Sequence, residues 1–194
     1  MVEAVENNPF IPIAWQKEHK GMQGTEYLDE ERAGNAENNW RIAAQQAVNA
    51  AKAIHANYYN DEESRVTKQL CNRLLEPFMW TTMLITGSKE GWDNFFELRC
   101  GNYDGFKSRK EASKEFLEKG NINTSTWSDM DWRKLNTGQA EIHMMALAEC
   151  IYDAVNESTP KQLQAGEWHI PMISDLESLK LSTDDQIKLS VWIS

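Results

Sequence analysis

The feature that most constrains the fold is a continuous helical pattern from about residue 28 to residue 58. Small and apolar residues recur at three- and four-residue steps along one side of it: Trp40, Ala44, Ala47, Ala51 and Ile54. This spacing is typical of one face of an α-helix. The alanines between residues 43 and 53 favour helix formation, and their short side chains let another helix approach closely. The sequence therefore predicts a long helix that packs along a narrow face.

Shorter elements follow this helix. Apolar spacing and capping residues predict helices over about 62–75, 89–99, 108–119 and 138–156, and a short last helix from about residue 182. Residues 78–86, with the sequence FMWTTMLIT, are aromatic or β-capable and end at Gly87. They favour a buried strand, although their length does not separate a strand from a short buried helix. The expected fold class is α+β, dominated by helices, with a small sheet that contains about 78–86.

The length and composition indicate one domain. The chain has 194 residues, of which 41% are hydrophobic and 26% charged, so it can form a core. We expect a single domain over 1–194, subdivided in the following way: an N-terminal arm over 1–27, a polar insertion over 101–137, and a C-terminal connection with a short helix over 161–194.

Net charge, hydropathy and cysteine content argue against several classes of protein. The formal net charge is −10, which disfavours a role on bulk nucleic acid or on an anionic membrane surface. No apolar run is long enough to cross a bilayer, and the first 15 residues do not resemble a secretory signal. The three cysteines lie far apart, as expected for free thiols in a reducing compartment such as the cytoplasm.

The common catalytic motifs give no assignment. The histidines at positions 19, 55, 143 and 169 are scattered, so we expect no metal site. Nucleophile-elbow, dinucleotide-binding and Walker A motifs do not occur in the sequence. No catalytic residue is therefore assigned.

Two arginines next to apolar segments are the candidate ligand-binding residues. Arg73 precedes the proposed strand, and Arg99 ends the helix predicted over 89–99. A guanidinium carries a rigid fork of donors that suits phosphate or a pair of carbonyls. Two such forks beside an apolar floor would form an anion pocket in an acidic protein. In the alternative interpretation each arginine caps helix carbonyls or pairs with Glu76 or Glu97.

Several ordered sequence blocks resemble phage-type relatives of the flavin-dependent thymidylate synthases. The blocks are the arm from Pro9 to Gln23, Asn72–Trp80 (NRLLEPFMW), Trp92–Arg99 (WDNFFELR), Gln139–Ile142 (QAEI) and Gly166–Pro171 (GEWHIP). They occur in the same order as in those relatives. Together they span about residues 9–171, which is most of the chain.

This resemblance implies an activity and a set of site residues. Enzymes of the family convert dUMP to dTMP with FAD, NADPH and methylenetetrahydrofolate, so they are flavoproteins and methyltransferases of nucleotide biosynthesis. Arg73 matches the family arginine expected near the dUMP phosphate, and Arg99 the one expected near the pyrimidine. Asn94 and Gln139 are implied beside the flavin or folate. The family also implies a thymidylate synthase complementing protein-like fold, and a homotetramer with shared active sites in the cytoplasm (the host cytoplasm, if phage-encoded).

The sequence also departs from the family. The R-H-R-x-x-S signature would lie upstream of Met1, and the H-x-S-P-F-E-H element beyond Ser194; Thr67 and His143 occupy positions where relatives carry His and Arg. We therefore expect a central portion of such an enzyme that needs a complementing fragment. The alternative is a repurposed relative without turnover that acts as a nucleotide-binding or interaction module. A third possibility is a structural helical domain whose arginines only pair with acids.

Overall fold

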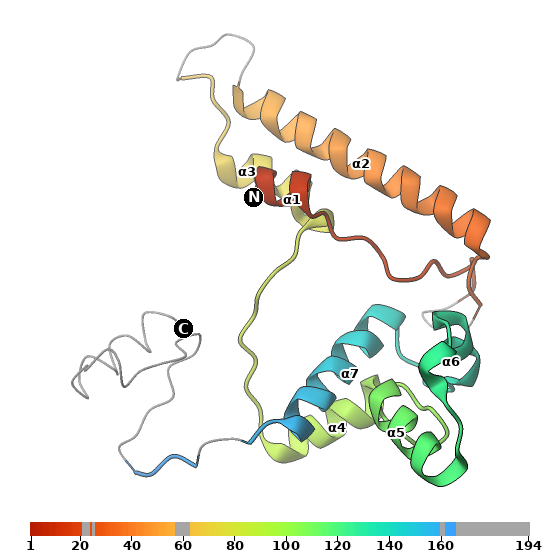
Figure 1. Cartoon of the computed structure of the whole chain (residues 1–194). Coiled ribbons are helices and arrows are strands. Elements are labelled where there is room, and N and C mark those ends of the chain that lie inside the picture. Colours follow the sequence, from red (N-terminus) through yellow and green to blue (C-terminus); the bar gives the residue numbers. More distant parts are fainter. Residues whose placement is uncertain (21–23, 25, 57–62, 160–161, 166–194) are drawn as a thin grey trace.

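Helices joined by irregular segments make up the computed structural model, which describes residues 1–20, 24, 26–56, 63–159 and 162–165 (Figure 1). In chain order the elements are α1 (Val2–Asn7), α2 (Glu30–Ala56), α3 (Lys68–Asn72), the 3₁₀ helix η1 (Arg73–Phe78), α4 (Lys89–Arg99), α5 (Arg109–Gly120), the 3₁₀ helix η2 (Thr124–Thr126), α6 (Asp129–Leu135) and α7 (Ile142–Glu157). No helix in these ranges is both long and apolar enough to span a membrane.

The long helix predicted over 28–58 is confirmed as α2, and it organises the first group of elements. Helices α1, α3 and η1 pack along it (Figure 1). Ala44, Val48 and Ala51 lie in this interface with Leu75 of η1, and each of them is at most 3% exposed. The small side chains of α2 therefore let the short helices pack closely, as the sequence indicated.

The second group places α4 and α5 against α7. The core between α4 and α7 contains Phe96, Cys100 and Ala148. A second core forms inside the segment expected to be a polar, solvated insertion, where Tyr103 is 1% and Trp132 is 8% exposed. That expectation was incomplete, because the aromatic side chains of this segment contact one another and cover each other from water.

The prediction of a small sheet that contains about residues 78–86 is wrong. Residues 79–88 are extended, but the described residues contain only isolated β-bridges, none of which involves this segment. In Figure 1 the segment runs from η1 to α4 with no strand beside it. Trp80 is 61% and Met83 is 68% exposed. Since a strand requires a neighbour for its backbone hydrogen bonds, the β-capable residues remain extended without forming a sheet. The fold of the described residues is helical rather than α+β.

The predicted helix over 62–75 is also only partly right. Its α-helical portion is α3, for which Thr67 is the N-cap. The chain then tightens into η1, which includes Pro77 and ends at Phe78. Proline lacks the backbone N–H that continues a helix and disfavours the helical conformation of the residue before it, so the helix ends close to Pro77.

The other predicted helices agree closely with the structure. Ser88 and Ser108 cap α4 and α5 through their side chains, and α7 begins slightly later than expected, at Ile142. Helices α1 and α6 were not predicted, although Ser128 and Asp131 form a capping box at the start of α6. The last predicted helix, and most of the connection over 161–194, lie outside the described residues.

The arm that follows α1 joins the two groups. The Ile13 N–H donates to His143 Nε2 of α7 over 3.1 Å, and the Ile13 carbonyl accepts from Arg133 Nη2 of α6 over 3.1 Å. At its other end, Phe10 makes an edge contact with the Trp80 ring, and its carbonyl accepts from the indole of Trp40. The arm therefore contacts both groups of helices.

Candidate functional site

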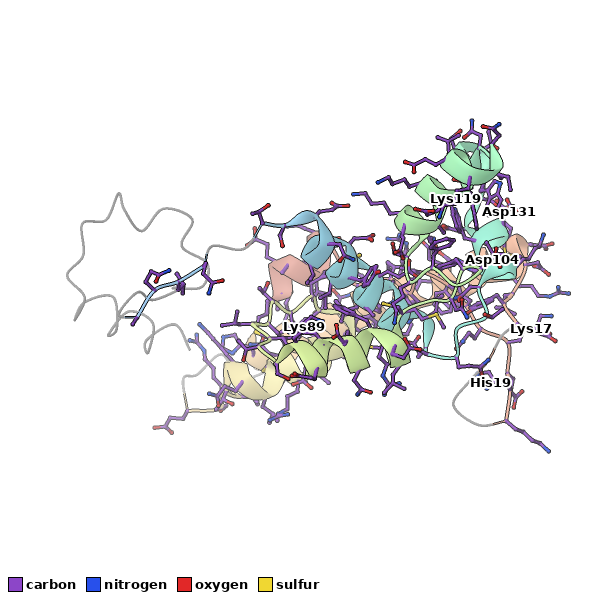
Figure 2. The ribbon with its side chains drawn as sticks, turned by 90° about the horizontal axis from the view of Figure 1, so that it is seen from below. Lys17, His19, Lys89, Asp104, Lys119 and Asp131 are labelled. Carbon is purple, nitrogen blue, oxygen red and sulfur yellow. The ribbon has the colours of Figure 1, made fainter. Side chains whose placement is uncertain are left out.

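A pocket of about 470 Å³ lies at the C-terminal end of α4. We call it the α4 pocket, and it is lined by residues 96–98, 100–102, 105–107 and 137–139. Figure 2 shows α4 along its length, with Lys89 at its first turn and Asp104 beyond its last turn. The pocket thus combines a helix end with two loops that are far apart in the sequence.

Two loops, one with Gly101 and one with Gly138, approach each other closely at the pocket wall. A Cβ on Gly101 would lie 2.5 Å from Cε2 of Tyr103 and 2.8 Å from Oε1 of Glu149. A Cβ on Gly138 would lie 3.1 Å from the Cα of Gly101. Asn136 fixes the same crossing, because its Oδ1 accepts from the N–H groups of Asn102 and Gly138. Only glycines permit the two loops to approach this closely.

The pocket has an apolar floor and one charged wall. Phe96 and Cys100 form part of the floor, and Glu97 and Lys107 form an ion pair at the side. The hydrogen bond from Lys107 holds the pKa of Glu97 below its ordinary value. Burial, together with nearby Glu149, raises the pKa of the Cys100 thiol to about 12. The thiol therefore stays protonated at neutral pH and is not a nucleophile.

Three of the four predicted ligand-binding residues lie on elements that border this pocket. Gln139 lines it directly with an exposed side chain. Asn94 and Arg99 belong to α4 and are exposed, and Arg99 lies between the lining residues Leu98 and Cys100 without lining the pocket itself. The fold thus brings Gln139 next to the last turn of α4, across about 40 residues of sequence.

Arg73 is not part of this arrangement. It begins η1, which packs on α2 in the other group of helices (Figure 1). Its side chain is 71% exposed and lies 3.6 Å from Glu76. The pairing with Glu76 that the alternative interpretation named is therefore present, but it is an exposed contact of small energetic weight. Within one chain, Arg73 and Arg99 do not converge on the α4 pocket.

A buried polar network beneath the pocket was not predicted. The hydroxyl of Tyr103 donates to Oε1 of Glu149 over 2.5 Å, and Nε of Arg109 lies 3.8 Å from Oε2 of the same carboxylate. Arg109 also contacts Asp129 at 3.0 Å. Glu149 is only 8% exposed, and this burial raises its pKa despite the two donors. The network attaches the segment over 101–137 to α7.

Sequence patterns gave no signal for this network, because its members are 6 to 46 residues apart. A charged residue at position 149, in the middle of the apolar face of α7, is the one hint that the sequence offers. Such a residue requires a buried partner.

Metal chemistry has no candidate here. Among the described residues, no group of three or more His, Cys, Asp or Glu side chains is placed to hold a metal ion.

Comparisons with protein-family models, with curated protein sequences and with solved structures found no match to this chain. The resemblance to flavin-dependent thymidylate synthases is therefore tested by none of these comparisons.

Proposed function

We propose that this chain is a flavin-dependent thymidylate synthase-like polypeptide that binds dUMP at the α4 pocket and works only together with a further chain. The observation that carries the proposal is the position of Gln139. It lies on the same pocket as the last turn of α4, the helix that also bears Asn94 and Arg99. These residues come from two separate sequence blocks that resemble the family, and the fold places the blocks side by side.

The pocket suits a pyrimidine nucleotide in size and in chemistry. Its volume of about 470 Å³ lies within the usual range of small-molecule sites. Phe96 supplies an apolar surface for a ring, and the amide of Gln139 offers both a donor and an acceptor. Arg99, which lies in the chain between the lining residues Leu98 and Cys100, carries a guanidinium suited to a uracil carbonyl or to a phosphate oxygen.

Arg73 enters the proposal through a second copy. It is exposed on η1, away from the α4 pocket of its own chain. An arginine intended for the nucleotide phosphate therefore has to come from a neighbouring subunit, in keeping with the tetramer that the resemblance implies. A complementing fragment that holds two copies together would serve the same end.

The described residues do not by themselves fit FAD. FAD is a dinucleotide and is larger than the α4 pocket, and only Asn94 and Gln139 are candidates for contact with it. When bound, the flavin would carry the hydride that NADPH provides, while methylenetetrahydrofolate supplies the carbon. This chain's own residues would bind and orient the pyrimidine, and no flavin step follows from them alone.

A repurposed relative without turnover is the second candidate, and the segment over 79–88 favours it. This segment has no charged residue, and Trp80, Met83 and Leu84 are each more than half exposed. Exposed apolar surface of this kind is typical of interaction sites. Such a module would keep the nucleotide pocket and use the segment to contact another protein.

Ligand-dependent thermal stability of the full chain separates these possibilities. With dUMP at 100 times its Kd, binding should stabilise the fold by about 2.7 kcal/mol. Arg99→Gln should weaken dUMP binding by about tenfold or more, because it removes a charge-assisted hydrogen bond. Lys89→Gln is the matched control, since Lys89 lies on the first turn of α4 and pairs with Asp93.

Flavin binding provides the second readout. If FAD absorbance co-purifies with the chain, or appears when FAD is added together with dUMP, the synthase-like assignment is supported. Binding of dUMP without FAD would select the repurposed module. If dUMP changes neither the melting temperature of the wild-type chain nor that of Arg99→Gln, both nucleotide-binding assignments are wrong.

A further inference from the structure

A second and smaller pocket borders the loop over 136–140 and shares Gly138 and Gln139 with the α4 pocket. It has a volume of about 220 Å³, and we call it the Arg133 pocket. The side chains that matter for its chemistry are Tyr27, Arg133, Lys134, Asn136 and Gln139. Among the described residues, no Asp or Glu lines it. In a chain with 30 acidic and 20 basic residues, a pocket with two cations and no carboxylate is unusual.

The guanidinium of Arg133 is only partly used by the protein. Its Nη2 donates to the Ile13 carbonyl over 3.1 Å, and among the described residues its Nη1 contacts only the Met130 sulfur, at 3.8 Å. Its Nε is buried and has no hydrogen-bond partner among the described residues. Because this Nε is closed off from the pocket as well, a ligand in the pocket can accept only from the Nη groups, of which Nη1 has no stronger contact than the one to sulfur among the described residues.

Two arginines that pair with acids behave differently. Arg41 and Arg109 each contact a carboxylate, at 2.7 and 3.0 Å respectively. Arg133 instead lies over the ring of Tyr27, with Cζ 5.1 Å from the ring centre. The ring and the Ile13 carbonyl hold the guanidinium in place without neutralising it. Arg133 lies in the last turn of α6, where a positive charge interacts favourably with the helix dipole. This interaction does not satisfy the hydrogen-bond donors of its Nη1.

We propose that the Arg133 pocket binds a phosphate-type oxyanion, with Arg133 as the principal donor and Lys134 as a second positive charge. The volume of 220 Å³ corresponds to roughly seven water molecules in the liquid. This is enough for one phosphate group with part of its hydration shell, and too small for a whole nucleotide. The inference goes beyond the proposed function, because Arg133, Lys134 and Asn136 do not line the α4 pocket, although Gln139 lines both pockets.

Asn136 provides a rigid wall for such an anion. Its Oδ1 is already engaged by two backbone N–H groups, and its Nδ2 lies 3.1 Å from the sulfur of Met145. The side chain is therefore fixed from both ends. The amide of Gln139 is exposed at the rim and can donate to a bound oxyanion.

Titration of the full chain with inorganic phosphate tests the proposal. Phosphate should raise the melting temperature and bind in calorimetry at constant ionic strength, whereas equivalent chloride should do neither. Arg133→Gln should weaken phosphate binding by about tenfold or more. Arg41→Gln, on α2, is the matched control and should bind phosphate as the wild type does.

Since Arg133 also holds Ile13 and Tyr27, its replacement can lower stability by itself. Lys134→Glu is therefore the second variant: its side chain is exposed, so the fold should persist while phosphate affinity falls about tenfold. Arg73→Gln distinguishes this pocket from the proposed nucleotide site and should leave phosphate binding unchanged. The inference is overturned if phosphate acts no differently from chloride, if Lys134→Glu binds phosphate normally, or if Arg73→Gln rather than Arg133→Gln abolishes binding.

Discussion

Replacement of Tyr103 by phenylalanine tests the buried network that joins the segment over 101–137 to α7. The change removes one hydroxyl and leaves the ring, which is 1% exposed and packs against Trp132. It deprives Glu149 of its shortest hydrogen bond, of 2.5 Å, and Arg109 Nε of the hydroxyl that it donates to over 3.3 Å, so that the ion pair with Arg109 at 3.8 Å remains. The carboxylate stays buried, so the loss cannot be made good by water.

The expected cost follows from the charge of the acceptor. A hydrogen bond to a charged group contributes about 1.5–3 kcal/mol, so we expect Tyr103→Phe to lower the free energy of unfolding by about 2 kcal/mol at pH 8. For a chain of this size that corresponds to a fall of about 4–8 °C in Tm. Chemical denaturation followed by circular dichroism measures it.

The pH dependence makes the prediction specific. Burial and nearby Asp153 raise the pKa of Glu149 above its ordinary value of 4.5, while Tyr103 and Arg109 oppose this rise. A carboxyl whose pKa is higher in the folded state binds its proton more tightly there, so stability falls as the pH rises through that pKa. Without the Tyr103 hydroxyl the pKa rises further. The destabilisation by Tyr103→Phe should therefore be larger at pH 8 than at pH 4.5, where Glu149 is closer to neutral in both proteins.

The control is Tyr27→Phe, which keeps the ring under Arg133 and removes a hydroxyl outside this network. It should change the free energy of unfolding by less than about 0.5 kcal/mol at either pH. A cost for Tyr103→Phe below 0.5 kcal/mol, or the same cost at both pH values, would refute the role assigned to the network.

Two further predictions concern packing, and both are measured by chemical denaturation. Leu75→Ala should cost about 2–5 kcal/mol, because Leu75 is fully buried between η1 and α2, whereas its neighbour Leu74, 41% exposed, should tolerate alanine at a small fraction of that cost. Equal costs at the two positions would contradict the packing of η1. Gly101→Ala should cost about 1–3 kcal/mol because its Cβ would strike Tyr103. Gly34→Ala, inside α2 with nothing within 4 Å, should stabilise by up to about 1 kcal/mol; a stable Gly101→Ala would show that the loops can separate.

The candidate site could be predicted only in part. Arg99 was proposed from its place beside apolar residues and from a sequence block, and Asn94 and Gln139 from blocks alone. All three belong to segments that border one pocket, of which Gln139 is a lining residue and Asn94 and Arg99 are not. The expected convergence of Arg73 with Arg99 does not occur within one chain, because η1 packs on α2 and not on α4. Arg133 attracted no attention in the sequence, where it is one cation in a polar segment. Its importance lies in a guanidinium that lines a pocket in which no Asp or Glu is a described lining residue, which is a property of its surroundings.

Local physics was enough to specify most helices of this protein. The small-residue stripe of α2 and the serine caps at Ser88 and Ser108 act over a few residues, so the sequence by itself determines them. The tertiary structure alone decided that residues 79–88 remain extended and that residues 80–88 are exposed, because strand formation depends on a neighbouring strand as well as on β-propensity. It also decided that Tyr103, Arg109 and Glu149 meet, since a buried carboxylate is stabilised only by donors that the fold brings to it from distant parts of the chain.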